Sequence, residues 1–149
     1  DIYESLDNDL KLEWEQVKKK RQNRNINEEE TNNGNNRFKN QKKLVKTFYD
    51  NKIPFLLGTD FAGMQFIYPG YSYHEEMELL SSLGISNFDI LKMATYSPAV
   101  FLGIDELYGT VEANRMADLV LFSENPVENI KYSLKIELVI KAGKIVRKN

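Results

Sequence analysis

The sequence of 149 residues contains no cysteine and a single histidine, His74. The absence of cysteine excludes disulfides, thiolate metal sites and cysteine nucleophiles. With one histidine, this chain alone cannot complete a metal site built on several histidines. No apolar run reaches the roughly 18 residues of a membrane span, and no charged-then-apolar signal peptide opens the chain. We therefore expect a soluble protein whose compartment the sequence leaves open.

Neither sign of charge dominates, because 20 basic residues face 22 acidic ones and the formal net charge is −2. This balance lacks the electrostatic footprint of a protein that binds nucleic acid or an anionic membrane. The basic run 18–21 ends a predicted helix, where cations complement the helix dipole. We expect neither a nucleic-acid nor a membrane partner. Apolar residues make up 42% of the chain, which supports a core and excludes global disorder.

Residues 1–52 differ in composition from the rest of the chain. Leu6, Leu10, Trp14 and Val17 recur at helical spacing and predict one amphipathic helix. The asparagine-rich stretch 23–36 is nearly devoid of apolar residues, and we interpret it as a mobile loop. A second helix is predicted after this loop from the spacing of Phe38, Leu44, Val45 and Phe48.

Residues 53–107 read as one strand followed by helices. The continuous apolar run Ile53–Leu57 predicts a strand buried on both faces, as in parallel sheets. A loop is expected over 61–73 and a helix from Tyr73 to Leu83. Ser86 and Asp89 form the pattern of a capping box at the start of a further helix. A short helix is predicted to open at Pro98 and to stop at Gly103.

Residues 108–149 change to a strand pattern. Apolar runs at 119–122 and 136–140, with a shorter one at 144–146, predict three strands. Lys141, Ala142 and Gly143 between the last two form a tight hairpin, with glycine available for a positive φ. We therefore divide the chain into segments 1–52, 53–107 and 108–149.

An ordered set of short motifs runs through residues 53–149. It comprises Gly58-Thr59-Asp60, Pro69-Gly70, His74 with Glu75–Leu80, Gly84, Ala94-Thr95, Pro98-Ala99, Leu102-Gly103, Gly109–Glu112, Ala117–Leu121, Asn125-Pro126 and the hairpin 139–144. The succession resembles the C-terminal portion of metal-dependent amidohydrolases, in the subgroup of imidazolonepropionase-like and prolidase-like enzymes. The resemblance covers 53–149 well and 1–52 loosely. One departure lies at 113–116, where the family commonly has a Pro-Gly-Lys-like turn; there we expect Asn114 to take the left-handed conformation.

The resemblance implies an α/β fold, in which this chain supplies the C-terminal part of a (β/α)₈ TIM barrel. Segment 53–57 would be the last barrel strand, and 108–149 would supply strands of a small composite β-sandwich. Segment 1–52 would be the helical portion that precedes the last barrel strand. In such barrels the chemistry sits at the C-terminal ends of the strands, which is where Asp60 falls.

By resemblance, Asp60 ligates a divalent metal, for which we expect zinc, and acts as the general base on the attacking water. A zinc-class ion lowers the pKa of its bound water to about 7. A nearby carboxylate can then take the proton of this water and deliver it to the leaving nitrogen. The alternative is that Asp60 is merely a turn or N-cap residue after a strand. The family's other metal ligands, mostly histidines of earlier strands, are absent here.

Two further residues are candidate substrate contacts. His74 does not match a metal-ligand position of the family, and it either contacts substrate or only positions its loop. Tyr68 belongs to an aromatic cluster with Phe61, Phe66, Tyr71 and Tyr73. This cluster either shapes a substrate pocket or packs its loop onto the scaffold. We interpret the acidic residues Glu75, Glu76 and Glu78 as a solvated helix start and Asp118 as a structural turn residue.

The function implied by the resemblance is hydrolysis of a non-peptide carbon–nitrogen bond, in an amide or cyclic amide, by metal-activated water. We expect the isolated chain to be inert, with a small-molecule amide as the substrate of the whole enzyme. Either the remainder of a parent polypeptide or a companion chain would complete the barrel. Because the strand at 53–57 lacks neighbours, we expect a homo-oligomer or an ordered remnant of a longer polypeptide. The alternative is a non-catalytic interaction or structural module derived from an amidohydrolase.

Overall fold

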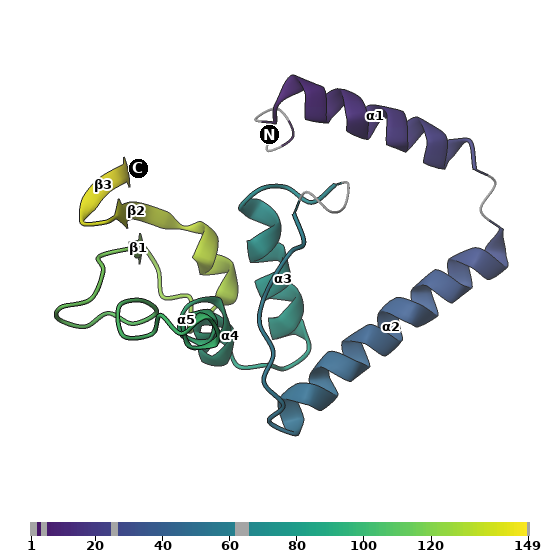
Figure 1. The fold of residues 1–149 in the computed structure, drawn as a ribbon. Coiled ribbons are helices and arrows are strands. Elements are labelled where there is room, and N and C mark those ends of the chain that lie inside the picture. Colours follow the sequence, from purple (N-terminus) through teal and green to yellow (C-terminus); the bar gives the residue numbers. More distant parts are fainter. Residues whose placement is uncertain (1–2, 4–5, 25–26, 62–65, 149) are drawn as a thin grey trace.

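The computed structural model describes residues 3, 6–24, 27–61 and 66–148. Its elements are, in chain order, α1 (Asn8–Gln22), α2 (Glu28–Asp50), α3 (Tyr71–Ser82), α4 (Asn87–Ala94), α5 (Tyr96–Leu102), β1 (Leu119–Phe122), the 3₁₀ helix η2 (Ile130–Leu134), β2 (Ile136–Lys141) and β3 (Lys144–Lys148). Figure 1 shows α1 and α2 as a two-helix arm beside a body formed by the later elements. Residues 25–26 of the asparagine-rich stretch and 62–65 of the aromatic loop lie outside the described residues.

The asparagine-rich stretch corrects the sequence prediction, because residues 28–36 are helical. Asn27 caps α2, its side chain accepting a hydrogen bond of 2.8 Å from the backbone N–H of Glu30. Glu28, Glu29 and Glu30 fill the first turn, where negative charge is favoured by the helix dipole. The interpretation as a mobile loop relied on poor burial. Caps and continuity with the second half of α2 sustain the helix without any buried residue.

The prediction of a strand at 53–57 is also wrong for this chain. In Figure 1 residues 53–59 run as an extended coil, and they belong to no strand. Ile53 donates its backbone N–H to the carbonyl of Phe48, so the segment is tied to the end of α2. A strand exists only where a neighbouring strand accepts and donates backbone hydrogen bonds, and the described part of the chain offers no neighbour on either side.

Helices α3, α4 and α5 form close to their predicted positions. At α4, Ser86 and Asp89 make the expected cap, with the Asp89 N–H donating to Ser86 Oγ at 3.1 Å. Gly103 stops α5 in the left-handed conformation with φ 68°. Helix α5 begins at Tyr96, two residues before Pro98, which therefore occupies the first helical turn rather than opening it.

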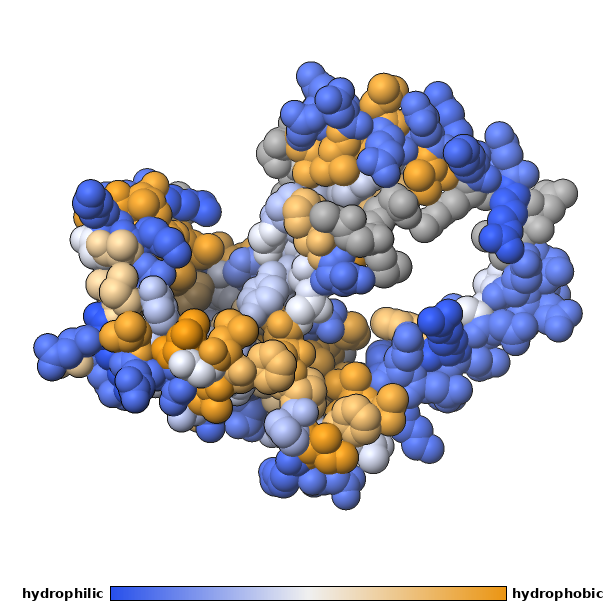
Figure 2. All heavy atoms as spheres, viewed as in Figure 1, coloured by the Kyte–Doolittle hydropathy of each residue, from blue (hydrophilic) through white to orange (hydrophobic). Residues whose placement is uncertain are grey.

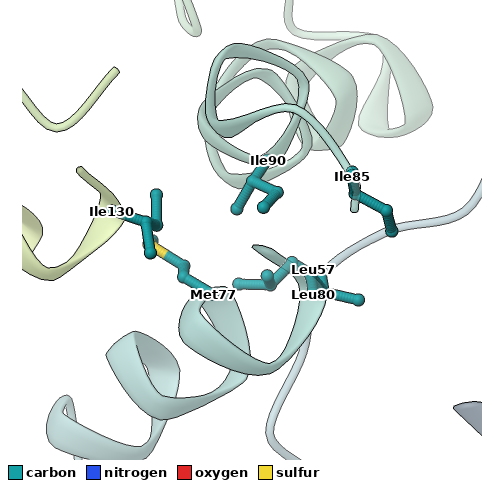
Figure 3. Close-up of a cluster of buried hydrophobic side chains, with 6 residues drawn as sticks. All are labelled: Leu57, Met77, Leu80, Ile85, Ile90 and Ile130. Carbon is teal, nitrogen blue, oxygen red and sulfur yellow. The ribbon is translucent and has the colours of Figure 1, made fainter. Parts of the chain in front are cut away.

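The core of the body lies between α3, α4, η2 and the extended segment. Figure 3 shows its six buried side chains converging from these elements and from the connection between α3 and α4, namely Leu57, Met77, Leu80, Ile85, Ile90 and Ile130. Ile90 is fully buried, and Val45 and Tyr49 of α2 pack against the cluster from outside. Leu57 thus fixes the end of the extended segment that leads to Asp60.

The three strands form one antiparallel sheet in the order β1-β2-β3. Ala142 and Gly143 adopt φ 48° and 76° in the hairpin between β2 and β3, as the turn requires. Asp118 holds this hairpin, accepting hydrogen bonds from the Ala142 N–H at 2.7 Å and the Lys141 ammonium at 3.1 Å. Asn114 has φ 68°, so the left-handed conformation expected there is confirmed.

Apolar side chains remain exposed on the body. Figure 2 shows them gathered around α4 and α5, whereas α2 is mostly hydrophilic. Phe101 of α5 is 76% exposed and Phe88 of α4 is 63% exposed. None of the described helices is long and apolar enough to cross a membrane.

Candidate functional site

Asp60 stands on the loop that leaves the core after Leu57. Leu57 is 8% exposed, and Asp60 follows it by three residues with an exposed side chain. The backbone of Asp60 has φ 55°, a left-handed conformation that aspartate tolerates better than most residues. Within the described ranges no hydrogen bond or ion pair engages its carboxylate. Asp60 is therefore an exposed carboxylate that follows a buried anchor, Leu57, by three residues.

The described residues do not fit a metal ion by themselves. They contain no group of three or more histidine, cysteine, aspartate or glutamate side chains that could hold one. Structural and catalytic zinc sites use three or four such protein ligands. Asp60 can supply one oxygen, and any metal that it binds requires further ligands from outside the residues that the structure describes.

His74 of α3 connects two elements of the body. Its Nδ1 lies 2.9 Å from Oγ of Ser133 in η2, and Ser133 is almost fully buried. Burial lowers the pKa of His74, and the nearby carboxylate of Glu78 opposes this shift. Each of these contacts is structural. They agree with the interpretation of His74 as a positioning residue, and the alternative of a substrate contact stays a prediction.

Tyr68 is engaged by other aromatic rings. Its ring meets the indole of Trp14 edge-on, with centroids 5.2 Å apart, and that of Tyr71 at 6.4 Å. Its backbone N–H donates to Oγ of Ser72, whose hydroxyl donates to Glu75. Of the two interpretations of the aromatic cluster, these contacts favour packing of the loop. No hydrogen bond, ion pair or ring contact among the described residues joins Asp60 to Tyr68 or His74.

The acidic residues of α3 follow the prediction of a solvated helix start only in part, because they lie beyond its first turn, and Glu75 is exposed whereas Glu76 and Glu78 are half-buried. Glu75 accepts the hydrogen bond from Ser72, and Glu78 lies 3.8 Å from the Lys131 ammonium. Glu76 is half-buried, and this burial raises the pKa of its carboxyl group. Asp118 follows the prediction of a structural turn residue. The backbone N–H of Ala142 and the Lys141 ammonium lower the pKa of its carboxyl group.

Sequence reasoning missed the contact between Tyr49 and Asp89. The Tyr49 hydroxyl donates to Oδ2 of Asp89 at 2.5 Å, and the Ser86 hydroxyl donates to the same oxygen at 2.6 Å. These two hydrogen bonds are the main causes of a lowered pKa of Asp89. The contact lies beside a groove of about 730 Å³ between the extended segment and helices α4 and α5. Asp60 does not line this groove, so the groove is separate from the candidate site.

Comparison with known proteins defines the class of the chain. The sequence pattern of the Amidohydrolase family matches residues 6–146. The chain therefore belongs to the amidohydrolase family, as its motifs predicted.

Named relatives agree with this assignment. The imidazolonepropionase of Thermoplasma acidophilum is 27% identical over 100 residues, covering 64% of this chain and 23% of the relative. A solved Xaa-Pro dipeptidase with methionine bound in its active site superposes with a TM-score of 0.64 and 25% identity, over 72% of this chain and 25% of the other. A solved Bifidobacterium longum protein described as a prolidase superposes with a TM-score of 0.55 and 34% identity, over 62% of this chain and 23% of the other. The chain thus spans about a quarter of the length of the relatives that it matches.

Proposed function

We propose that the chain forms the C-terminal part of a metal-dependent hydrolase that cleaves a carbon–nitrogen bond. The observation that carries the proposal is the match of the amidohydrolase family pattern to residues 6–146. The names of the relatives support a substrate with a carbon–nitrogen bond to cleave, since one is an imidazolonepropionase and another is a dipeptidase of Xaa-Pro. We favour a small amide or cyclic amide over an ordinary peptide.

In the proposed site Asp60 would contribute one carboxylate oxygen to a divalent metal, with zinc expected, and the other ligands would come from outside the described residues. Such a metal would supply water acidic enough to attack near neutral pH. The carboxylate of Asp60 would accept a proton from the attacking water and return it to the leaving nitrogen. Its short side chain on a loop fixed by buried Leu57 suits this role, because a general base must be held within hydrogen-bond reach.

We further propose that another polypeptide segment, on the same or a companion chain, supplies the remaining barrel strands and metal ligands. The extended segment 53–60 has no strand neighbour in the described chain, and the body leaves large apolar side chains exposed. Both features match a surface that is completed by further strands and helices. The isolated chain is then inert, since one aspartate cannot hold the metal alone.

The test is to purify the tagged chain alone and from its native cells, where a companion would co-purify. Metal content is measured by elemental analysis, and hydrolysis is assayed on cyclic amides and Xaa-Pro dipeptides. We expect almost no metal and no turnover for the chain alone, and about one or two ions per chain with activity in the complex. In the complex, Asp60→Asn should lose activity by about two orders of magnitude or more, whereas Asp105→Asn, a loop aspartate elsewhere in the body, should keep it.

Two outcomes would contradict the proposal. Hydrolysis by the isolated chain that depends on Asp60 would show that no companion is needed. A stable complex without metal or turnover would instead favour the alternative of a non-catalytic interaction module.

A further inference from the structure

Trp14 holds the arm against the loop that follows Asp60. It is 2% exposed, although α1 projects from the body as part of the arm. Within the described part of the arm Trp14 is the one buried side chain, since α2 contains none and the other described side chains of α1 are half-buried or exposed. The docking of α1 therefore depends on this indole.

The partners of Trp14 are rings of the loop between Asp60 and α3. The indole lies 5.3 Å from the ring of Phe66 and 5.2 Å from that of Tyr68, the second contact being edge-on at 87°. Edge-to-face pairs at such distances stabilise beyond their buried area. Tyr68 in turn contacts Tyr71 at the first residue of α3. The rings thus join α1, the loop and α3.

Asp60 lies along the chain between two anchors. Leu57 fixes the loop to the core three residues before it, and Trp14 fixes the loop at Phe66 six residues after it. We propose that Trp14 is a positioning residue for Asp60, an inference that rests on the proposed function of Asp60. With only the Leu57 anchor, Asp60 itself gains conformations in which its carboxylate is misplaced. The arm then helps to position Asp60, although it supplies none of the reacting groups.

The chain offers a clean way to measure this restraint, because it contains no cysteine. A nitroxide label is attached at Phe61→Cys, beside Asp60 on the side of the Trp14 anchor. A matched label is attached at Gly58→Cys, next to Leu57, where an added Cβ meets nothing within 4 Å. Electron paramagnetic resonance then reports the mobility of each position in the 149-residue chain.

We expect Trp14→Ala to increase the mobility of the label at position 61 several-fold and to leave the label at position 58 unchanged. Trp14→Phe should restore most of the restraint, because a ring remains between Phe66 and Tyr68. The matched control is Leu12→Ala on the same helix, since Leu12 is 61% exposed. Circular dichroism confirms that α3–α5 stay folded in each variant.

Equal mobility at position 61 with and without Trp14 would overturn the proposal. So would equal loosening of both positions, because Trp14 would then only stabilise the fold. In the native complex we expect Trp14→Ala to lower kcat about tenfold or more with little change in KM, as misplacement of a catalytic group does. An inactive or metal-free complex would refute the proposed function of Asp60, whereas the label measurements test the anchoring itself.

Discussion

The arm and the body of this chain reach order by different means. Among its described residues the arm, α1 and α2, buries one side chain, and it contacts the body through Trp14 at one end and through Val45 and Tyr49 at the other. The body has a core of six buried side chains. The 23-residue helix α2 is therefore stabilised by its caps, the charges of its first turn and its length, whereas α3 and α4 are stabilised by packing. Substitutions of the same kind should act differently in the two regions.

The largest difference is expected for removal of an aliphatic side chain. Ile90→Ala empties a fully buried position in the body and should lower the free energy of unfolding by about 2–5 kcal/mol. Leu44→Ala on α2 removes a side chain that is 53% exposed and should change it by no more than about 0.5 kcal/mol. Urea unfolding followed by circular dichroism measures both. Similar losses in the two variants would show that α2 packs as tightly as the body.

Replacement of glycine by alanine should change stability in opposite directions. At Gly109 of the body, φ is 95° and a Cβ would lie 2.9 Å from Cα of Tyr96, so Gly109→Ala should cost about 2 kcal/mol or more. At Gly34 in α2 a Cβ meets nothing within 4 Å, so Gly34→Ala should stabilise by about 0.5–1 kcal/mol. Thermal unfolding compares them, and a loss at Gly34 would contradict the helical assignment of this stretch.

The smallest expected effect is the pH dependence of stability that His74 contributes, and it concerns the body alone. Burial lowers the pKa of His74 below its ordinary value of 6.5, so the unfolded chain binds a proton more readily than the folded chain. The contribution of His74 to stability is present above pH 6.5 and is lost as the pH falls through the folded pKa. His74→Gln should flatten the stability profile between pH 7 and pH 5, measured as urea midpoints. An unchanged slope would show that His74 is solvated in the folded chain.

Much of the body could be predicted from local patterns. Caps and turns carry their own chemistry, which is why Ser86, Gly103, Asn114 and the hairpin at 142–143 were predicted correctly. The strand at 53–57 was predicted wrongly. An apolar run indicates that a segment is buried, but it does not show that this chain contains the neighbouring strands. The prediction of a mobile loop over 23–36 was wrong at 28–36 for the opposite reason. Low hydrophobicity shows that a segment is not buried, but it does not exclude a helix.

The site was predictable only in part. Asp60 could be identified from its motif after an apolar run, whereas its environment depends on contacts across the fold. Trp14 and Tyr68 lie far apart in sequence, and so do Tyr49 and Asp89. Helical spacing places Trp14 on an apolar face but does not name the surface that this face meets. An aromatic-rich loop and a lone tryptophan were the available signals.

The antiparallel sheet has two chemically unlike edges. The outer strand β3 carries Lys144, Arg147 and Lys148, and charges of this kind discourage another strand from pairing. The opposite edge, β1, consists of Leu119, Val120, Leu121 and Phe122, and it carries no charge. The edge at β1 therefore leaves a further strand free to pair, whereas the charges of β3 disfavour pairing there. In any larger sheet that contains these three strands, we expect the additional strand beside β1.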